Sequence, residues 1–159
     1  MITELGLKNF KAWKEIDKMS LAPITGLFGT NSSGKSSILH FLLMLKQTAQ
    51  ADDRKLVLDF GDEKGKVNLG SFKDVIYNHN VSNKLSFDIT WNLPNPLSIP
   101  NISAAAILKF SSDISLFGKN LVAEEMMYQS GSLFNFSMTL KTGKGYELNS
   151  PQIKFVRKQ

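Results

Sequence analysis

The sequence predicts an α/β fold in which a mixed sheet carries a phosphate-binding loop and its helix and is followed by an antiparallel β lobe. Residues 29–36 match the pattern G-x-x-x-x-G-K-[ST]. Residues 23–28 are typical of a short buried strand entering that loop, and 37–50 have the apolar spacing of a helix. From residue 84 onward the period changes to two, which is typical of half-buried strands.

Two strands are predicted ahead of this loop. Residues 2–7 and 13–21 have the composition of strands, and the connection at 9–12 is short. We therefore expect the chain to open as a hairpin.

The loop and the start of its helix, residues 29–37, form the candidate site for ATP and Mg²⁺. A loop with this spacing wraps its backbone N–H groups around a phosphate, while Lys35 reaches the β/γ oxygens and the Ser36 hydroxyl completes the coordination of Mg²⁺. The helix N-terminus adds partial positive charge. The remaining expected members of the cradle are Gly29, Thr30, Asn31, Ser32, Ser33, Gly34 and Ser37.

Chance matches to this motif are rare. Two fixed glycines followed by Lys and Ser or Thr arise on the order of once in several thousand to tens of thousands of positions. The bland alternative is a Gly/Ser-rich turn between strand and helix, and the order strand, loop, helix favours the phosphate site.

The segment after the helix is polar and rich in turns. A break at 50–54 leads to a short apolar segment at 55–60, and 61–70 is a charged connection. Residues 71–76 are predicted to form one helical turn with Ser71 as its N-cap.

The second half is predicted to be an antiparallel meander with little helix. The alternation over 85–91 indicates a strand with one buried face, and the three prolines of 92–101 predict a loop. Further strands are expected at 104–110, 121–129, 133–141 and 146–148.

Three segments carry a resemblance to a known superfamily. They are Leu-Gly-Leu-Lys-Asn-Phe-Lys at 5–11, Phe-Gly-Thr-Asn-Ser-Ser-Gly-Lys-Ser-Ser at 28–37 and Leu-Gly-Ser-Phe-Lys-Asp-Val at 69–75. The sequence resembles the ATP-binding heads of the ABC/SMC/RecF-like superfamily, in particular bacterial AAA-type ATPases related to the OLD and RecF groups. These motifs cover about the first 90 residues.

The resemblance implies a P-loop NTPase fold of ABC type and a role in ATP hydrolysis. Residues 1–159 would be the N-terminal portion of one head, with hairpin, P-loop and helix in 1–55 and the antiparallel β lobe in 56–159. Lys35 would neutralise phosphate charge in catalysis. ATP held between two heads would drive their engagement, so the implied partner is a second head, as a homodimer or as the missing C-terminal half. DNA or a nuclease is a further implied partner, in DNA repair, chromosome handling or phage defence.

Hydrolysis in that superfamily also needs an acidic Walker B strand end and a signature motif, and neither is convincing here. Asp59 ends an apolar run but follows the helix too soon, so we interpret it as a strand-end residue of the β lobe. Ser130 and Gly131 are interpreted as a hairpin turn. The chain alone is therefore expected to bind ATP weakly or not at all and to hydrolyse it very slowly.

Other polar candidates receive structural interpretations. Gln47 lies within the predicted helix and is interpreted as a surface residue rather than as a water-positioning glutamine. His40 and His79 are isolated, which indicates neither a metal site nor an activating base.

Two neighbouring glutamates and the two tryptophans also receive structural interpretations. Glu124 and Glu125 are expected to face opposite sides of a strand, which excludes a paired acid/base. Trp13 and Trp91 have the chemistry to stack on a base, but core packing is the preferred interpretation.

Bulk composition agrees with a single domain and sets limits on partners. The chain has 159 residues, no cysteine and a net charge of +5, so we expect a cytoplasmic protein with no disulfide framework. The charge is compatible with DNA or RNA but does not demand it, because only Lys154, Arg157 and Lys158 form a local group. No targeting signal or membrane span is visible, so no membrane partner is expected.

Two other functions stay open at this point. One is a nucleotide-gated binding module in which ATP acts as a switch without significant turnover. The other is a P-loop phosphotransferase with Asp59 as its metal-side acid, which predicts a parallel sheet.

Overall fold

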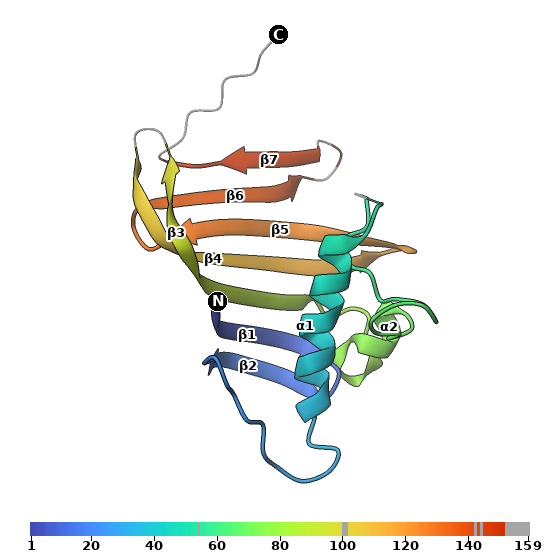
Figure 1. Cartoon of the computed structure of the whole chain (residues 1–159). Coiled ribbons are helices and arrows are strands. Elements are labelled where there is room, and N and C mark those ends of the chain that lie inside the picture. Colours follow the sequence, from blue (N-terminus) through green and yellow to red (C-terminus); the bar gives the residue numbers. More distant parts are fainter. Residues whose placement is uncertain (54, 100–101, 142, 144, 152–159) are drawn as a thin grey trace.

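A single sheet with one long helix across its face makes up most of the structure (Figure 1). A computed structural model of the protein describes residues 1–53, 55–99, 102–141, 143 and 145–151. The helical elements are α1 (Lys35–Gln50), α2 (Phe72–Val75) and a 3₁₀ turn (Tyr77–His79). The strands are β1 (Ile2–Phe10), β2 (Trp13–Ser20), β3 (Leu85–Ile99), β4 (Ile102–Phe117), β5 (Asn120–Ser130), β6 (Phe134–Lys141) and β7 (Gly145–Asn149).

The strands follow the order β2-β1-β3-β4-β5-β6-β7, and every neighbouring pair is antiparallel. The predicted opening hairpin is confirmed as β1 and β2, and β1 also pairs with β3. The hairpin therefore lies in the same sheet as the strands of the second half.

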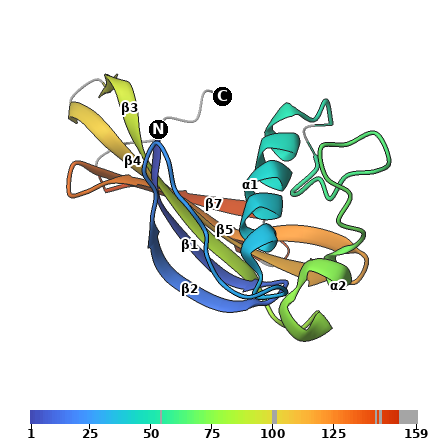
Figure 2. The same cartoon turned by 60° about the horizontal axis from the view of Figure 1, so that its bottom comes forward.

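The α1 helix packs on the sheet through an apolar face, as its spacing predicts. Ile38, Phe41 and Met44 recur every three residues and are buried against the sheet. The Phe41 ring lies edge-on to the rings of Phe10 in β1 and Phe87 in β3, with both centroid distances 5.2 Å. Figure 2 shows α1 and α2 on the same side of the sheet, where this core lies.

The short helix α2 confirms the predicted turn with Ser71 as its N-cap. The Asp74 carboxylate accepts hydrogen bonds from the Ser71 hydroxyl at 2.7 Å and the Ser71 backbone N–H at 2.8 Å, which completes a capping box. These two bonds, the hydroxyl first, lower the pKa of Asp74. The Val75 carbonyl then accepts the Lys11 N–H at 2.6 Å, so α2 supports the turn between β1 and β2.

The prediction of a mixed sheet with a buried strand at 23–28 is wrong for the described residues. This segment leaves the sheet after β2 and forms no strand. Ile24 and Phe28 are 92% and 95% exposed. A strand needs a hydrogen-bonded neighbour for its backbone groups, and no described strand pairs with this segment.

The prediction of a loop over 92–101 is also wrong over its described part, because β3 continues to Ile99. Trp91 is the last residue of β3 paired with β1, and Asn92 still exchanges backbone hydrogen bonds with Met1. Beyond Asn92 the described neighbour of β3 is β4, with a register shift between Asn92 and Leu97. Proline lacks an N–H and is tolerated where a strand is free on one side or bulged, so Pro94 and Pro96 fit here. Residues 100 and 101 lie outside the described residues.

Strands predicted at 104–110, 121–129, 133–141 and 146–148 correspond to β4, β5, β6 and β7, although β6 begins one residue later, at Phe134. The cationic group at Lys154, Arg157 and Lys158 lies outside the described residues. Within the described part of the chain, neither length nor apolarity allows any helix to cross a bilayer.

Candidate phosphate-binding site

The loop that contains the motif curls immediately before α1, at the lower end of that helix in Figure 1. Three of its residues have positive φ: Gly29 at 149°, Ser32 at 66° and Gly34 at 85°. Left-handed backbone of this kind turns successive peptide groups toward one another, and glycine adopts it without steric cost. The curl ends where Lys35 begins α1.

The Lys35 ammonium lies inside this curl. Its Nζ donates hydrogen bonds to the carbonyl oxygens of Gly29 at 2.9 Å and Thr30 at 2.6 Å, and it lies 3.3 Å from Ser33 Oγ. A Cβ added to Gly29 would come 3.1 Å from Ser33 Oγ, so the glycine keeps the curl narrow. A cation fixed inside a curled loop attracts an anion of phosphate size.

The first turn of α1 contributes two serines with different surroundings. Ser36 is exposed and directly follows Lys35. Ser37 is 9% exposed, and its backbone N–H donates to the Gly34 carbonyl at 3.0 Å. Because α1 has 16 residues, its N-terminus also carries a full helix dipole. Asn31 and Ser32 lie exposed between the two glycines of the motif.

Trp13 is a neighbour of this loop that the sequence did not reveal. Its indole N–H donates to the Gly34 carbonyl at 2.9 Å, across 21 positions of sequence. The preferred interpretation of core packing is therefore incomplete, since one edge of the half-buried ring binds the loop. Trp91 packs beside a second small core of Ala105, Leu108 and Phe134.

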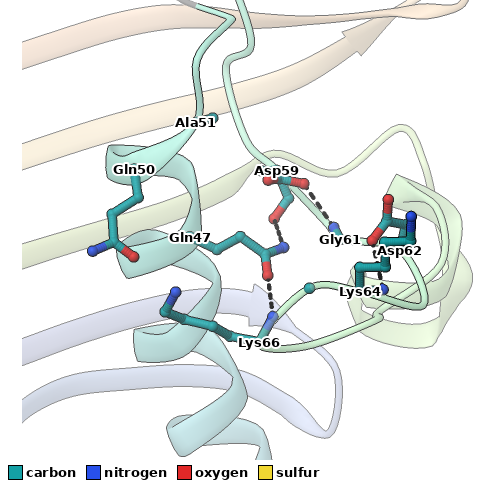
Figure 3. A pocket seen from close by; sticks show the side chains of 9 residues that line it. Gln47, Gln50, Ala51, Asp59, Gly61, Asp62, Lys64 and Lys66 are labelled. Carbon is teal, nitrogen blue, oxygen red and sulfur yellow. Dashed lines mark hydrogen bonds between the residues drawn. The ribbon is translucent and has the colours of Figure 1, made fainter.

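Gln47 and Asp59 lie together near the other end of α1 (Figure 3). The prediction that Gln47 is a surface residue is wrong, because it is 8% exposed. Its Oε1 accepts the Lys66 N–H at 2.7 Å, and its Nε2 donates to the carbonyls of Asp59 at 3.3 Å and Val67 at 3.4 Å. An amide buried in this way is satisfied by backbone groups of a distant loop, which its own helical pattern does not reveal.

The interpretation of Asp59 as a strand-end residue is wrong as well, since no strand is present over 55–60 among the described residues. Its carboxylate accepts the Gly61 N–H at 2.8 Å, and its own N–H donates to Thr48 Oγ1 at 2.9 Å. Thr48 and Ser36 are separated by about 18 Å along α1, at roughly 1.5 Å per residue. Asp59 thus does not share a metal ion with Ser36. It lines a separate polar hollow of about 390 Å³ with Gln47.

The other polar candidates form no site. His79 Nδ1 lies 2.8 Å from the Lys73 carbonyl oxygen. Ser130 and Gly131 occupy the predicted hairpin turn between β5 and β6, with Gly131 at φ 50°. Throughout the described ranges, no group of three or more His, Asp or Glu side chains is arranged to hold a metal ion.

The expectation that Glu124 and Glu125 face opposite sides is wrong. The pairing of β4 with β5 shifts register after Asp113, so that Asp113 faces Glu125 and Ile114 faces Ala123. The extra residue, Glu124, forms a bulge, and a bulge re-aims side chains. Both glutamates line one hollow of about 310 Å³. Lys84 lies in the same hollow and forms an ion pair with Glu124.

A comparison with protein families places these observations in context. Residues 1–155 match the model of the family described as the AAA ATPase domain. A search of curated proteins found no match.

Proposed function

Because the chain belongs to the AAA ATPase domain family, we propose that it binds ATP with Mg²⁺ in the curl at residues 29–37. The description of the family indicates nucleotide-binding and ATPase function, and the motif at 29–36 is that of a P-loop NTPase. The observation that carries the proposal is the position of the Lys35 ammonium, held by the Gly29 and Thr30 carbonyls at the N-terminus of α1. This is the part of the chain where positive charge and the donors of a long helix converge.

Each residue of the curl has a role in this proposal. Lys35 exchanges its bonds to loop carbonyls for bonds to the β/γ-phosphate oxygens and neutralises charge during hydrolysis. The backbone N–H groups of Lys35 and Ser36, at the start of α1, have no carbonyl one helical turn earlier in the helix and would face phosphate, whereas the Ser37 N–H is held by the Gly34 carbonyl. The cradle is completed by Gly29, Thr30, Asn31, Ser32, Ser33, Gly34 and Ser37.

The residues present fit a magnesium ion. Mg²⁺ retains several waters and binds proteins through few side chains plus the phosphates of its nucleotide. The exposed hydroxyl of Ser36, next to Lys35, is a suitable single ligand. A magnesium ion held there would supply positive charge that offsets the charge of the phosphates. The protein's part is to fix the phosphate chain with the Lys35 ammonium and the helix N-terminus.

The finer proposal is an ABC/SMC-like head of the RecF and OLD type, whose engagement with a second head is driven by ATP. The motif segments at 5–11 and 69–75 support it. Exposed apolar side chains beside the curl, Ile24 and Phe28, together with Leu39 on α1, support a protein partner at this end. That partner is a second copy or a C-terminal half of the head. DNA repair or phage defence with DNA or a nuclease as a further partner, and a cytoplasmic location, belong to the same proposal.

A nucleotide-gated binding module is the second candidate. It is favoured by the position of Asp59, whose N–H bonds Thr48. Thr48 lies about 18 Å along α1 from Ser36, at roughly 1.5 Å per residue, so Asp59 is remote from the phosphate loop and does not activate water there. A phosphotransferase is disfavoured, since it predicts a parallel sheet and all described strand pairs are antiparallel.

Phosphate release and self-association of the full-length protein test these proposals together. An ATPase head predicts turnover that rises with protein concentration, ATP-dependent association, and loss of both in Lys35→Ala. A binding module predicts ATP-dependent association without turnover. Association and turnover that are equal in the parent and Lys35→Ala would refute both.

A further inference from the structure

The phosphate loop is braced by a side chain from outside it. Trp13 is the first residue of β2, directly after the β1–β2 turn, and its indole N–H donates to the Gly34 carbonyl at 2.9 Å. Gly34 is the N-cap of α1, and because glycine has no side chain it makes no capping hydrogen bond to the helix. The bond therefore links the sheet to the last peptide group before Lys35.

That peptide group also carries the Lys35 N–H. In a planar trans peptide the C=O and N–H bonds point in opposite directions. When the indole holds the Gly34 carbonyl toward β2, the Lys35 N–H must point away from β2. This N–H is the first of α1 and lies too early in the helix to have an intrahelical acceptor. Trp13 consequently sets the direction of a donor that lies next to the Lys35 ammonium.

The space around Gly34 shows that the fit is close. A Cβ at this position would lie 2.8 Å from Trp13 Nε1 and 3.1 Å from the Ala12 Cβ. With φ at 85°, Gly34 also has a backbone conformation that other residues rarely adopt. The glycine leaves room for the indole. The turn that carries the indole is itself held by the bond from the Lys11 N–H to the Val75 carbonyl, at 2.6 Å.

We propose that Trp13 is a positioning residue of the phosphate loop, which aims the Gly34–Lys35 peptide at the phosphates of the bound nucleotide. This inference rests on the proposed function. The Ser37 N–H donates to the same carbonyl at 3.0 Å, so the orientation is weakened rather than lost without the indole N–H. We expect Mg-ATP affinity to fall by about three- to tenfold, which corresponds to one neutral hydrogen bond.

The test uses the full-length protein carrying Trp91→Phe. Residues 1–159 contain two tryptophans, so Trp13 is then the remaining tryptophan of this range. Trp13 is then replaced by Phe, and separately by benzothienylalanine, an isostere that lacks the N–H. A fluorescent ATP analogue with Mg²⁺ measures affinity, and urea unfolding measures stability. The inference predicts a three- to tenfold loss of affinity in the isostere with an unchanged unfolding midpoint, and a shift of Trp13 emission when Mg-ATP binds to the parent.

The variant Lys35→Ala distinguishes failure of the Trp13 role from failure of the phosphate site itself. If Lys35→Ala loses nucleotide binding while the isostere binds like the parent, the role of Trp13 is refuted and the phosphate site stands. If Lys35→Ala binds Mg-ATP like the parent, the phosphate site itself is refuted. A lower unfolding midpoint in the isostere with unaltered affinity would mean that the indole N–H serves stability alone, which also refutes the inference.

Discussion

The side-chain amide of Gln47 lies against the backbone of Val67, whose N–H donates to Gln47 Oε1 at 3.3 Å and whose carbonyl accepts from Gln47 Nε2 at 3.4 Å. Gly61 and Gly65 approach the same amide so closely that a Cβ on either would lie 2.6 Å from one of its atoms. The helix α1 thereby holds the connection between its own C-terminus and α2. Since α1 begins at the phosphate loop, one helix joins both polar sites.

Gln47→Ala should lower the free energy of unfolding by about 1–3 kcal/mol, because it leaves buried backbone groups of the connection without partners. Urea unfolding measures the change, and amide exchange over 59–67 should accelerate. Gln50→Ala is the matched control on an exposed position of the same helix, with an expected change within about 0.5 kcal/mol. Equal effects of the two variants would contradict the role of Gln47.

Gly34→Ala should destabilise the protein more than Gly118→Ala. Both glycines have positive φ, 85° and 61°, so both variants incur backbone strain of about 1–2 kcal/mol. At Gly118 an added Cβ meets nothing within 4 Å, whereas at Gly34 it meets the Trp13 indole at 2.8 Å. Thermal unfolding of the two variants measures the difference. Identical melting temperatures would show that the Trp13 indole does not clash with a Cβ at position 34.

Glu124→Gln should make the free energy of unfolding depend less on pH on the acid side of neutrality. The hydrogen bond from Lys84, and then one from Ser115, lowers the pKa of Glu124 below its ordinary value of 4.5. A carboxylate with a lowered pKa contributes stability above that ordinary value and loses the contribution as the pH falls through the lowered pKa. The Lys84 and Glu124 side chains are 50% and 27% exposed, so the contribution is at most about 1 kcal/mol. Urea unfolding of parent and variant at pH 3 and pH 7 measures it, and a difference that does not change with pH would contradict the assignment.

Local signals predicted those elements whose determinants lie close together in sequence. The hairpin of β1 and β2, the apolar face of α1 and the Ser71 cap of α2 each depend on residues within about one helical turn or one strand. The curl before α1 follows the motif for the same reason, since its glycines and Lys35 lie within seven positions.

Features that depend on distant neighbours were not predictable in this way. Residues 93–99 continue β3 through pairing with β4, and two prolines are tolerated there because no described strand pairs with the other side beyond Asn92. Gln47 is buried because a loop about 20 positions away supplies its partners. The bond from Trp13 to Gly34 also spans 21 positions. Period and propensity carry no information about such partners.

The most direct test of the central claim is calorimetric titration of ATP into the full-length protein, with Mg²⁺ and with EDTA. If residues 29–37 hold the phosphates, saturable uptake occurs with Mg²⁺, weakens with EDTA and in Ser36→Ala, and disappears in Lys35→Ala while that variant remains folded. Absence of Mg-ATP uptake by the parent protein, or full uptake by folded Lys35→Ala, would contradict the account.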